Sequence, residues 1–169
     1  MSEQLEVLNK ASAALKTSPA ELVPRLIKLQ DNYKSLHNQL QRTHALLATT
    51  PQLGETQTAH LAGGLTLVLH ELPSDLDIEV LRKRGQHLRQ THPDAVHVFL
   101  QDNTVACSVN TVHIPAKFHA SKLLGDLTRK LGGKGGGQAD WAQGRLSAAT
   151  SSAAVIAAAR ELFDAVPAL

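Results

Sequence analysis

The sequence contains very little cysteine and few aromatic residues. Cys107 is the single cysteine among 169 residues, so no internal disulfide can form and a reducing compartment is expected. Aromatic residues make up 3% of the chain, so the core must be built mostly from Leu, Val, Ile and Ala. No signal peptide and no apolar stretch long enough to span a bilayer are found. These features predict a soluble, cytoplasmic chain of one domain with an appendage and no membrane contact.

Residue patterns that would support catalysis or metal binding are also missing. The nine histidines include no His-x-x-x-His pair, and Cys107 has no second cysteine to work with, which argues against zinc. Scattered surface or half-buried histidines are therefore expected. A Walker loop is excluded because Lys134 is followed by Gly135 rather than Ser or Thr. We predict no catalytic residue, no metal and no cofactor, so the chain is not expected to be an enzyme.

Positive charge is unevenly distributed along the chain. The formal net charge is only +2, which does not by itself suggest nucleic acid. Residues 114–145, however, carry six Lys and Arg against two Asp. Positive charge therefore concentrates around one segment, which is typical of a local anion-binding surface.

That segment, residues 132–143, reads Gly-Gly-Lys-Gly-Gly-Gly-Gln-Ala-Asp-Trp-Ala-Gln. Five of its first six residues lack a Cβ, so the backbone can approach another surface closely. One interpretation is a helix C-cap followed by a flexible loop. The other is a contact loop whose bare backbone lies against nucleobases or ribose while nearby cations hold phosphates. Trp141 could stack on such a ligand, but a lone Trp in a small domain is more often part of the core.

The first 48 residues are expected to form a helical arm. Residues 3–16 have leucines at helical spacing, and Ser18 to Glu21 has the form of a capping box. A long helix should follow, with Pro24 in its opening turn. Steps of four and three separate Leu22, Leu26, Leu29, Tyr33, Leu36, Leu40, Thr43 and Leu47. This heptad seam predicts either a helical hairpin within the chain or a coiled coil with a second copy.

Residues 60–169 are expected to form a small globular domain. After a polar loop, the pattern predicts strands at 65–70, 95–100 and 104–110. It predicts helices at 74–90, 117–131 and 148–166, and a glycine loop at 132–137. The final helix should place Val155, Ala159, Leu162 and Val166 on one stripe. The polar loop should cover residues 49–60. The fold class is therefore α+β, a helical arm followed by a β-α-β-β-α domain with a glycine-rich loop and a C-terminal helix.

The glycine segment also carries a family resemblance. Leu123-Leu124 through Leu131 and residues 132–143 resemble the C-terminal domain of alanyl-tRNA synthetases, which is shared with DHH phosphoesterases as their associated domain. The usual pattern is Gly-Gly-x-Gly-Gly-Gly-Arg-Pro-Asp-Met-Ala-Gln. Here Gln138, Ala139 and Trp141 replace the Arg, Pro and Met. Upstream, Leu15-Lys-Thr-Ser-Pro-Ala-Glu-Leu and the heptad helix resemble the linker of those synthetases, so the likeness covers roughly residues 14–165.

The resemblance implies a non-catalytic tRNA-binding domain. In the family this domain contacts the outer corner of tRNA, where the D and T loops meet, and aids aminoacylation and editing. The implied partners are tRNA, expected to be tRNA-Ala, and a second copy bound through the helical arm. The aminoacylation and editing motifs, and the Asp-His-His core of DHH phosphoesterases, are absent from this sequence. The chain is thus expected to be a fragment of the enzyme or a free-standing relative.

Two other functions stay open at this stage. A protein-interaction or dimerisation module that has lost RNA binding is favoured by the heptad seam, the modest charge and the neutral Gln138. A DNA-binding relative would use the same basic face. If RNA is bound, the expected contacts are Gly132, Gly133, Lys134, Gly135, Gly136, Gly137, Gln138, Lys130, Arg129, Lys122 and Arg145.

Overall fold

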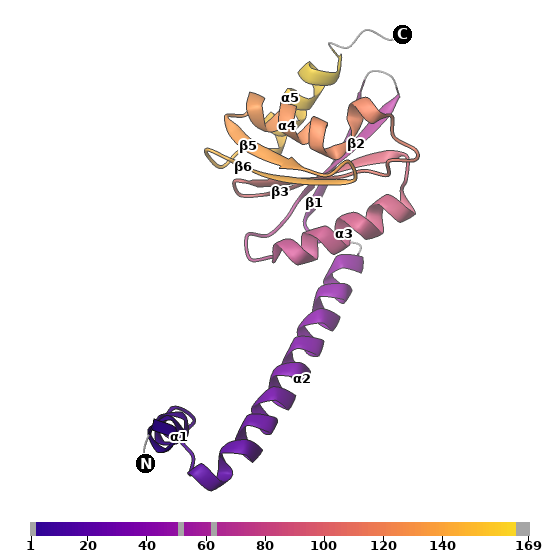
Figure 1. The fold of residues 1–169 in the computed structure, drawn as a ribbon. Coiled ribbons are helices and arrows are strands. Elements are labelled where there is room, and N and C mark those ends of the chain that lie inside the picture. The colour runs from indigo at the N-terminus through magenta and orange to yellow at the C-terminus, as the bar shows by residue number, and fades with distance from the viewer. Residues whose placement is uncertain (1–2, 51–52, 62–63, 165–169) are drawn as a thin grey trace. The chain divides into compact units, whose positions relative to one another are not determined.

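A computed structural model describes residues 3–50, 53–61 and 64–164 (Figure 1). Residues 1–43 and 44–169 form two compact units. The first is helical, and the second contains a six-stranded sheet with helices on both faces. The predicted α+β class is confirmed.

The first unit consists of α1 (Glu3–Ala14), a short 3-10 turn η1 (Pro19–Glu21) and most of α2 (Leu22–Thr49). Pro24 lies in the opening turn of α2, as predicted. The capping box is not formed as expected, because the Ser18 side chain makes no capping hydrogen bond. The Thr17 hydroxyl instead donates to the Glu21 carboxylate at 3.4 Å.

The heptad seam of α2 is exposed along the first unit. Its members Leu26, Leu29, Tyr33, Leu36 and Leu40 are between 44% and 75% exposed. Within the first unit, α1 therefore leaves the seam uncovered. A row of apolar side chains facing water is typical of a helix that packs against a partner.

The second unit is built on one mixed sheet with strand order β1-β2-β3-β4-β6-β5. The strands are β1 (Glu55–Leu61), β2 (Leu65–Glu71), β3 (Ala95–Gln101), β4 (Thr104–Ser108), β5 (Gly133–Gly137) and β6 (Trp141–Leu146). Among the strand pairs of the described residues, β2–β3 is parallel and the other four are antiparallel. Helix α3 (Ile78–Thr91) makes the crossover that this pair requires. The Asp77 carboxylate caps it by accepting from the Glu79 N–H at 3.0 Å.

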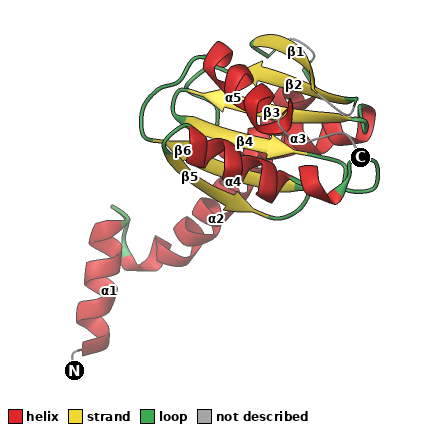
Figure 2. Ribbon diagram, turned by 90° about the horizontal axis from the view of Figure 1, so that it is seen from above, coloured by secondary structure: helices red, strands yellow, loops and turns green. Residues whose placement is uncertain are grey.

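Helices cover both faces of the sheet (Figures 1 and 2). On one face lie α4 (Ala120–Lys130) and α5 (Ser152–Asp164), and on the other lies α3. The larger core joins Leu123, Leu127 and Val155 to the apolar side chains of β2 and β3. The smaller core joins Leu81 of α3 to Phe99 and Trp141. Trp141 is only 8% exposed, so its interpretation as a core residue holds.

Two segments predicted as loops are strands. The expected polar loop at 49–60 contains the last residue of α2 and most of β1, a polar edge strand in which only Ala59 and Leu61 are buried. The glycine loop is β5, paired along its length with β6. Neither segment shows the alternating apolar pattern from which strands are recognised. Val166 of the predicted final helix lies outside the described residues.

Two glycines in helices provide a test of the packing between α3 and the sheet. A Cβ on Gly85 of α3 would lie 2.6 Å from Trp141 Cζ3 and 2.9 Å from Ser108 Cβ. Gly85→Ala should therefore lower the free energy of unfolding by about 1–3 kcal/mol, because the core must move apart. A Cβ on Gly125 of α4 meets nothing within 4 Å, so Gly125→Ala should raise it by up to about 1 kcal/mol. Urea denaturation of both variants measures the difference. Equal effects would show that α3 does not contact Trp141 as described.

Candidate nucleic-acid interface

The glycine-rich segment forms one edge of the sheet as part of the β5–β6 ribbon. The cross-strand pairs are Gly133–Leu146, Lys134–Arg145, Gly135–Gly144, Gly136–Gln143 and Gly137–Ala142. Beyond the last pair, the Gln138 N–H donates to the Trp141 carbonyl at 2.7 Å. The segment is thus an ordered edge strand and hairpin rather than a flexible loop.

Most of the glycines in β5 are required by packing within the protein. A Cβ on Gly144 would lie 2.8 Å from the Gly135 Cα and 3.0 Å from Cγ2 of Thr128 in α4. Cβ atoms on Gly133 and Gly137 would also meet the β6 backbone, at 2.4 and 2.5 Å. Real Cβ atoms do not approach backbone this closely, so these positions let β5 and β6 lie against each other beneath α4.

Gly136 differs from its neighbours, because a Cβ there would meet nothing within 4 Å. Side chains alternate along a strand, and Gly135 and Gly144 face α4. Gly136 therefore faces the opposite side of the sheet, and it is exposed. The absence of a side chain at Gly136 has no cause in the packing of the described chain.

Two cations lie beside Gly136 on the same side of the ribbon. Lys134 and Arg145 are directly opposite each other in the ladder and both are exposed. Among the described residues neither has an ion-pair partner. Like charges directly opposite each other are unfavourable in a sheet. We name the surface formed by Lys134, Gly136, Gln138, Gln143 and Arg145 the ribbon face.

The outer edge of β5 presents backbone groups. Hydrogen-bonded and non-hydrogen-bonded pairs alternate in an antiparallel ladder. Because Gln138 and Trp141 form a bonded pair, the alternation turns the N–H and C=O groups of Gly133, Gly135 and Gly137 away from β6. In the sheet of the second unit β5 is a terminal strand, so these groups are available to a ligand.

The turn between β5 and β6 is held in place from three directions. The Ala139 carbonyl accepts from the Ala120 N–H at 2.8 Å, and the Asp140 carbonyl accepts from the Val109 N–H at 3.0 Å. Arg89 Nη1 of α3 lies 2.7 Å from Asp140 Oδ2. Asp140, which matches the family pattern, therefore fixes the hairpin, and the ribbon face is preorganised.

The residues predicted to bind RNA fall into separate groups. Lys134, Gly136, Gln138 and Arg145 lie together on the ribbon face, whereas three further cations belong to α4, on the opposite face of the sheet. Those three are Lys122, Arg129 and Lys130. Arg129 Nη1 lies 3.1 Å from Asp126 Oδ1, and the Lys130 ammonium pairs with the Glu161 carboxylate. Two of the three are thus already paired within the protein.

Gly132 has another role at the end of α4. It has φ +75° and follows the C-cap residue Leu131. This left-handed conformation strongly favours glycine. The predicted helix C-cap is therefore present, although the chain continues as a strand and not as a loop.

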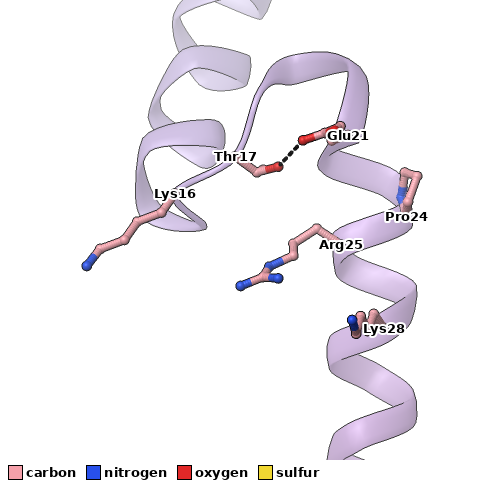
Figure 3. A pocket seen from close by; sticks show the side chains of 6 residues that line it. All are labelled: Lys16, Thr17, Glu21, Pro24, Arg25 and Lys28. Carbon is pink, nitrogen blue, oxygen red and sulfur yellow. Dashed lines mark hydrogen bonds between the residues drawn. The ribbon is translucent and has the colours of Figure 1, made fainter.

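A second group of cations lies in the first unit and was missed by sequence reasoning. A hollow of about 330 Å³ at the turn between α1 and α2 is lined by Lys16, Thr17, Glu21, Pro24, Arg25 and Lys28 (Figure 3). The sequence feature that could have indicated this group is the balance of positive and negative residues in the two units. Residues 1–43 contain six Lys and Arg against four Asp and Glu, whereas residues 44–169 contain eleven of each.

Three histidines of the described residues are buried, His44, His70 and His97, contrary to the prediction of scattered surface or half-buried histidines. His70 of β2 and His97 of β3 are 4% and 1% exposed, and their rings are joined by a 3.2 Å contact between Nε2 and Nδ1. Burial, together with the neighbouring His97, lowers the pKa of His70 to about 3. Burial also lowers the pKa of His97 to about 4, although its hydrogen bond to His92 opposes this shift. Both rings are therefore neutral at pH 7.

No arrangement suited to a metal ion or to a membrane span emerges from the described part of the chain. No group of three or more His, Cys, Asp or Glu in that part could hold a metal ion. Within the same residues, no helix has both the length and the apolar character needed to cross a bilayer. Cys107 is buried, which raises the pKa of its thiol.

Comparison with known proteins supports the resemblance inferred from the sequence. The family model described as the DHHA1 domain matches residues 64–165. The alanine–tRNA ligase of Cupriavidus necator is 32% identical over 141 residues, which are 80% of this chain and 16% of that protein. The alanine–tRNA ligase of Psychrobacter arcticus is 29% identical over 154 residues, which are 89% of this chain and 17% of that protein. The chain thus spans less than a fifth of the length of these curated relatives.

Solved structures share the fold. The C-Ala domain from Aquifex aeolicus alanyl-tRNA synthetase superposes with a TM-score of 0.55 at 23% identity, covering 64% of this chain and 98% of that domain. A DHH-domain protein described as a member of the s1p family of ribosomal proteins superposes with a TM-score of 0.53 at 13% identity, covering 88% of this chain and 35% of that one. The resemblance to the C-terminal domain of alanyl-tRNA synthetases is confirmed.

The buried histidine pair predicts how stability depends on pH. An unfolded histidine binds a proton below its ordinary pKa of 6.5, whereas folded His70 and His97 do so only near pH 3 and 4. Their contribution is therefore fully present above pH 6.5 and is lost as the pH falls toward 4 and 3. His70→Phe keeps a ring beside Phe99 but removes one titrating group. Both proteins should lose unfolding free energy when the pH is lowered from 7 to 5. The loss should be smaller for His70→Phe than for the unmodified chain, by up to about 2 kcal/mol.

Denaturant titrations at the two pH values measure this difference. His37→Phe on the exposed surface of α2 is the control and should leave the pH dependence unchanged. If His70→Phe and the unmodified chain lose the same stability between pH 7 and pH 5, His70 is not buried in neutral form.

Proposed function

Because the chain belongs to the DHHA1 domain family, we propose that it is a non-catalytic tRNA-binding domain that docks its ribbon face on folded RNA. The relatives that carry the same segment are alanine–tRNA ligases, and a solved relative is the C-Ala domain of such an enzyme. These names support tRNA as the ligand. The observation that carries the proposal is the exposed Gly136, which has no side chain and lies beside Lys134 and Arg145, two cations with no ion-pair partner among the described residues.

The ribbon face suits RNA for a steric reason. At Gly136 the backbone itself is the surface, so a flat base or ribose can approach without displacing a side chain. Folded RNA is recognised through such exposed, unstacked positions and through its shape. The outer corner of tRNA, where the D and T loops meet, presents a flat base-pair platform of this kind. We therefore place the contact at the tRNA elbow.

Charge and the strand edge supply the remaining interactions. Lys134 and Arg145 would neutralise backbone phosphates and thereby relieve their mutual repulsion across the ladder. The outward N–H groups of Gly133, Gly135 and Gly137 would donate to phosphate or ribose oxygens. Gln138, where the family usually has Arg, adds a hydrogen-bonding group but no charge, so the electrostatic part of the affinity is reduced.

Binding at the elbow would aid aminoacylation and editing, the reactions that catalytic domains of alanyl-tRNA synthetases carry out. On this proposal the chain acts in the cytoplasm, prefers tRNA-Ala because its relatives act on it, and needs no cofactor. Its own contribution is positioning, since the residues of the ribbon face hold RNA and move no proton.

The proposal predicts which charges matter for tRNA binding. Lys134→Ala with Arg145→Ala should weaken binding and make the slope of log affinity against log salt shallower by about 1–2, because two phosphate contacts are lost. Arg129→Ala with Lys130→Ala removes the same charge from the α4 side and should have little effect. Gly136→Val should fold normally, since its Cβ has open space, yet lower the affinity at least tenfold. Filter binding across a salt series provides these measurements.

Several outcomes would contradict the proposal. Absence of binding at low salt, or equal losses for the two double variants, would remove the ribbon face as the site. Comparable affinity for duplex DNA and for tRNA would instead favour a DNA-binding relative.

A second candidate function is supported by the exposed heptad seam. Self-association through α2 would bury Leu26, Leu29, Tyr33, Leu36 and Leu40, which the first unit leaves in water. The chain would then be a dimerisation module through its arm, either in addition to RNA binding or in place of it.

Sedimentation tests this second function. The unmodified chain should show a concentration-dependent dimer, whereas Leu29→Lys with Leu36→Lys should be monomeric, because two charges would enter the seam. Ser35→Lys with Asn38→Lys adds the same charge to the outer side of α2 and should still dimerise. A monomer at every concentration would exclude the arm as a dimerisation element.

A further inference from the structure

The hollow at the turn between α1 and α2 gathers cations from two separate stretches of sequence. Its volume is about 330 Å³, and three of its six lining residues are Lys16, Arg25 and Lys28. They are half of the six Lys and Arg in residues 1–43. In the described part of the chain none of the three has an ion-pair partner.

The single carboxylate in this lining is turned toward the turn itself. Figure 3 shows the Glu21 side chain beside that of Thr17, whose hydroxyl donates to it at 3.4 Å. In the same view Arg25 reaches from α2 into the space below this pair. The hollow therefore keeps an excess of positive charge in a concave surface.

Lys16 occupies a backbone position that glycine normally takes. Helix α1 ends in a Schellman motif, in which the Thr17 N–H donates to the Ser12 carbonyl at 3.0 Å and the Lys16 N–H to the Ala13 carbonyl at 3.2 Å. Lys16 then has φ +49°, a left-handed conformation that is unfavourable for residues with a Cβ. A lysine held in this conformation is more naturally explained by its charge than by the turn.

We propose that this hollow binds a phosphodiester group of an RNA backbone, as a second anchor on the arm. The planar fork of Arg25 can donate two hydrogen bonds to one phosphate, and Lys16 and Lys28 add flexible point charges. None of the six described residues that line the hollow is aromatic, so the site recognises phosphate and not a base. That the phosphate belongs to the tRNA bound by the ribbon face rests on the proposed function.

The arm provides its own matched control. Lys16→Gln, Arg25→Gln and Lys28→Gln together remove the three cations of the hollow. Lys10→Gln, Lys34→Gln and Arg42→Gln remove the other three from the same unit, so both triple variants have the same net charge. In filter binding with the full chain and tRNA, the hollow variant should lose at least tenfold in affinity and make the salt slope shallower by about 2. The control variant should lose no more than about threefold, because it removes only long-range attraction.

Two single substitutions separate a binding role from a structural one. Glu21→Gln removes the one negative charge from the lining and should raise the affinity for tRNA. Lys16→Gly relieves the left-handed backbone and should leave the helicity and the melting temperature unchanged or higher, while the affinity falls. A purely structural Lys16 would give unchanged binding in that variant, which would overturn the proposal.

The test also distinguishes this site from the ribbon face. Titration of the full chain with inorganic phosphate, followed by the Thr17 amide and the Arg25 Nε–H in ¹⁵N NMR, should give saturable shifts that the hollow variant lacks. If tRNA does not bind but phosphate shifts these signals, the hollow stands and the proposed function fails. If tRNA binds and the two triple variants lose affinity equally, the hollow fails and the ribbon face is unaffected.

Discussion

The close approach of β5 to β6 beneath Thr128 determines what the second unit can offer to a ligand. Gly135 and Gly144 face each other there, and a Cβ would lie 2.8 Å from the opposite Cα on Gly144 and 3.0 Å from it on Gly135. Because α4 closes over that side of the ribbon, the alternation of the strands turns Lys134, Gly136 and Arg145 to the other side. The ribbon lies at the end of the sheet, so that side stays exposed and β5 keeps one edge unpaired. A single steric constraint thus produces a bare backbone surface and places two cations on it.

The structure explains why several residues of the family pattern are needed for the β5–β6 hairpin. Asp140 pairs with Arg89 and fixes the turn, and the glycines at 133, 135 and 137 permit the packing of the two strands. These positions serve the fold whether or not RNA is bound. Gln138 is exposed, and it replaces the charged residue of the pattern. The departure therefore falls on the surface, where it leaves the hairpin intact and, on the proposed function, would change the affinity for RNA.

Sequence periodicity predicted the elements whose side chains carry a pattern. The heptad of α2, the helix predicted at 74–90, which corresponds to α3, and the strands predicted at 95–100 and 104–110, which correspond to β3 and β4, were all recognised in this way. It failed for β5, because a run of glycines has no side chains to alternate, and for β1, whose buried residues are only Ala59 and Leu61. The buried His70–His97 pair was missed because histidine reads as polar, and the hollow because its cations come from both sides of a turn. Periodicity also could not separate the predicted site residues on the ribbon face from those on α4. Tertiary packing decides which face of the β5–β6 ribbon is exposed, and the sequence pattern does not show it.

The distribution of charge explains why two anchors would be needed. The second unit has eleven cations and eleven acids, so its net charge does not attract a polyanion. On the ribbon face the attraction would come from the local pair Lys134 and Arg145, while Arg129, Lys130 and Arg89 are paired internally. Two phosphate contacts give weak binding at physiological salt. The excess of positive charge lies on the arm, where the hollow could supply about three more. Because both anchors belong to one chain, occupation of one anchor would raise the effective concentration of RNA at the other. The affinity for tRNA would then depend on both anchors together and not on either one alone.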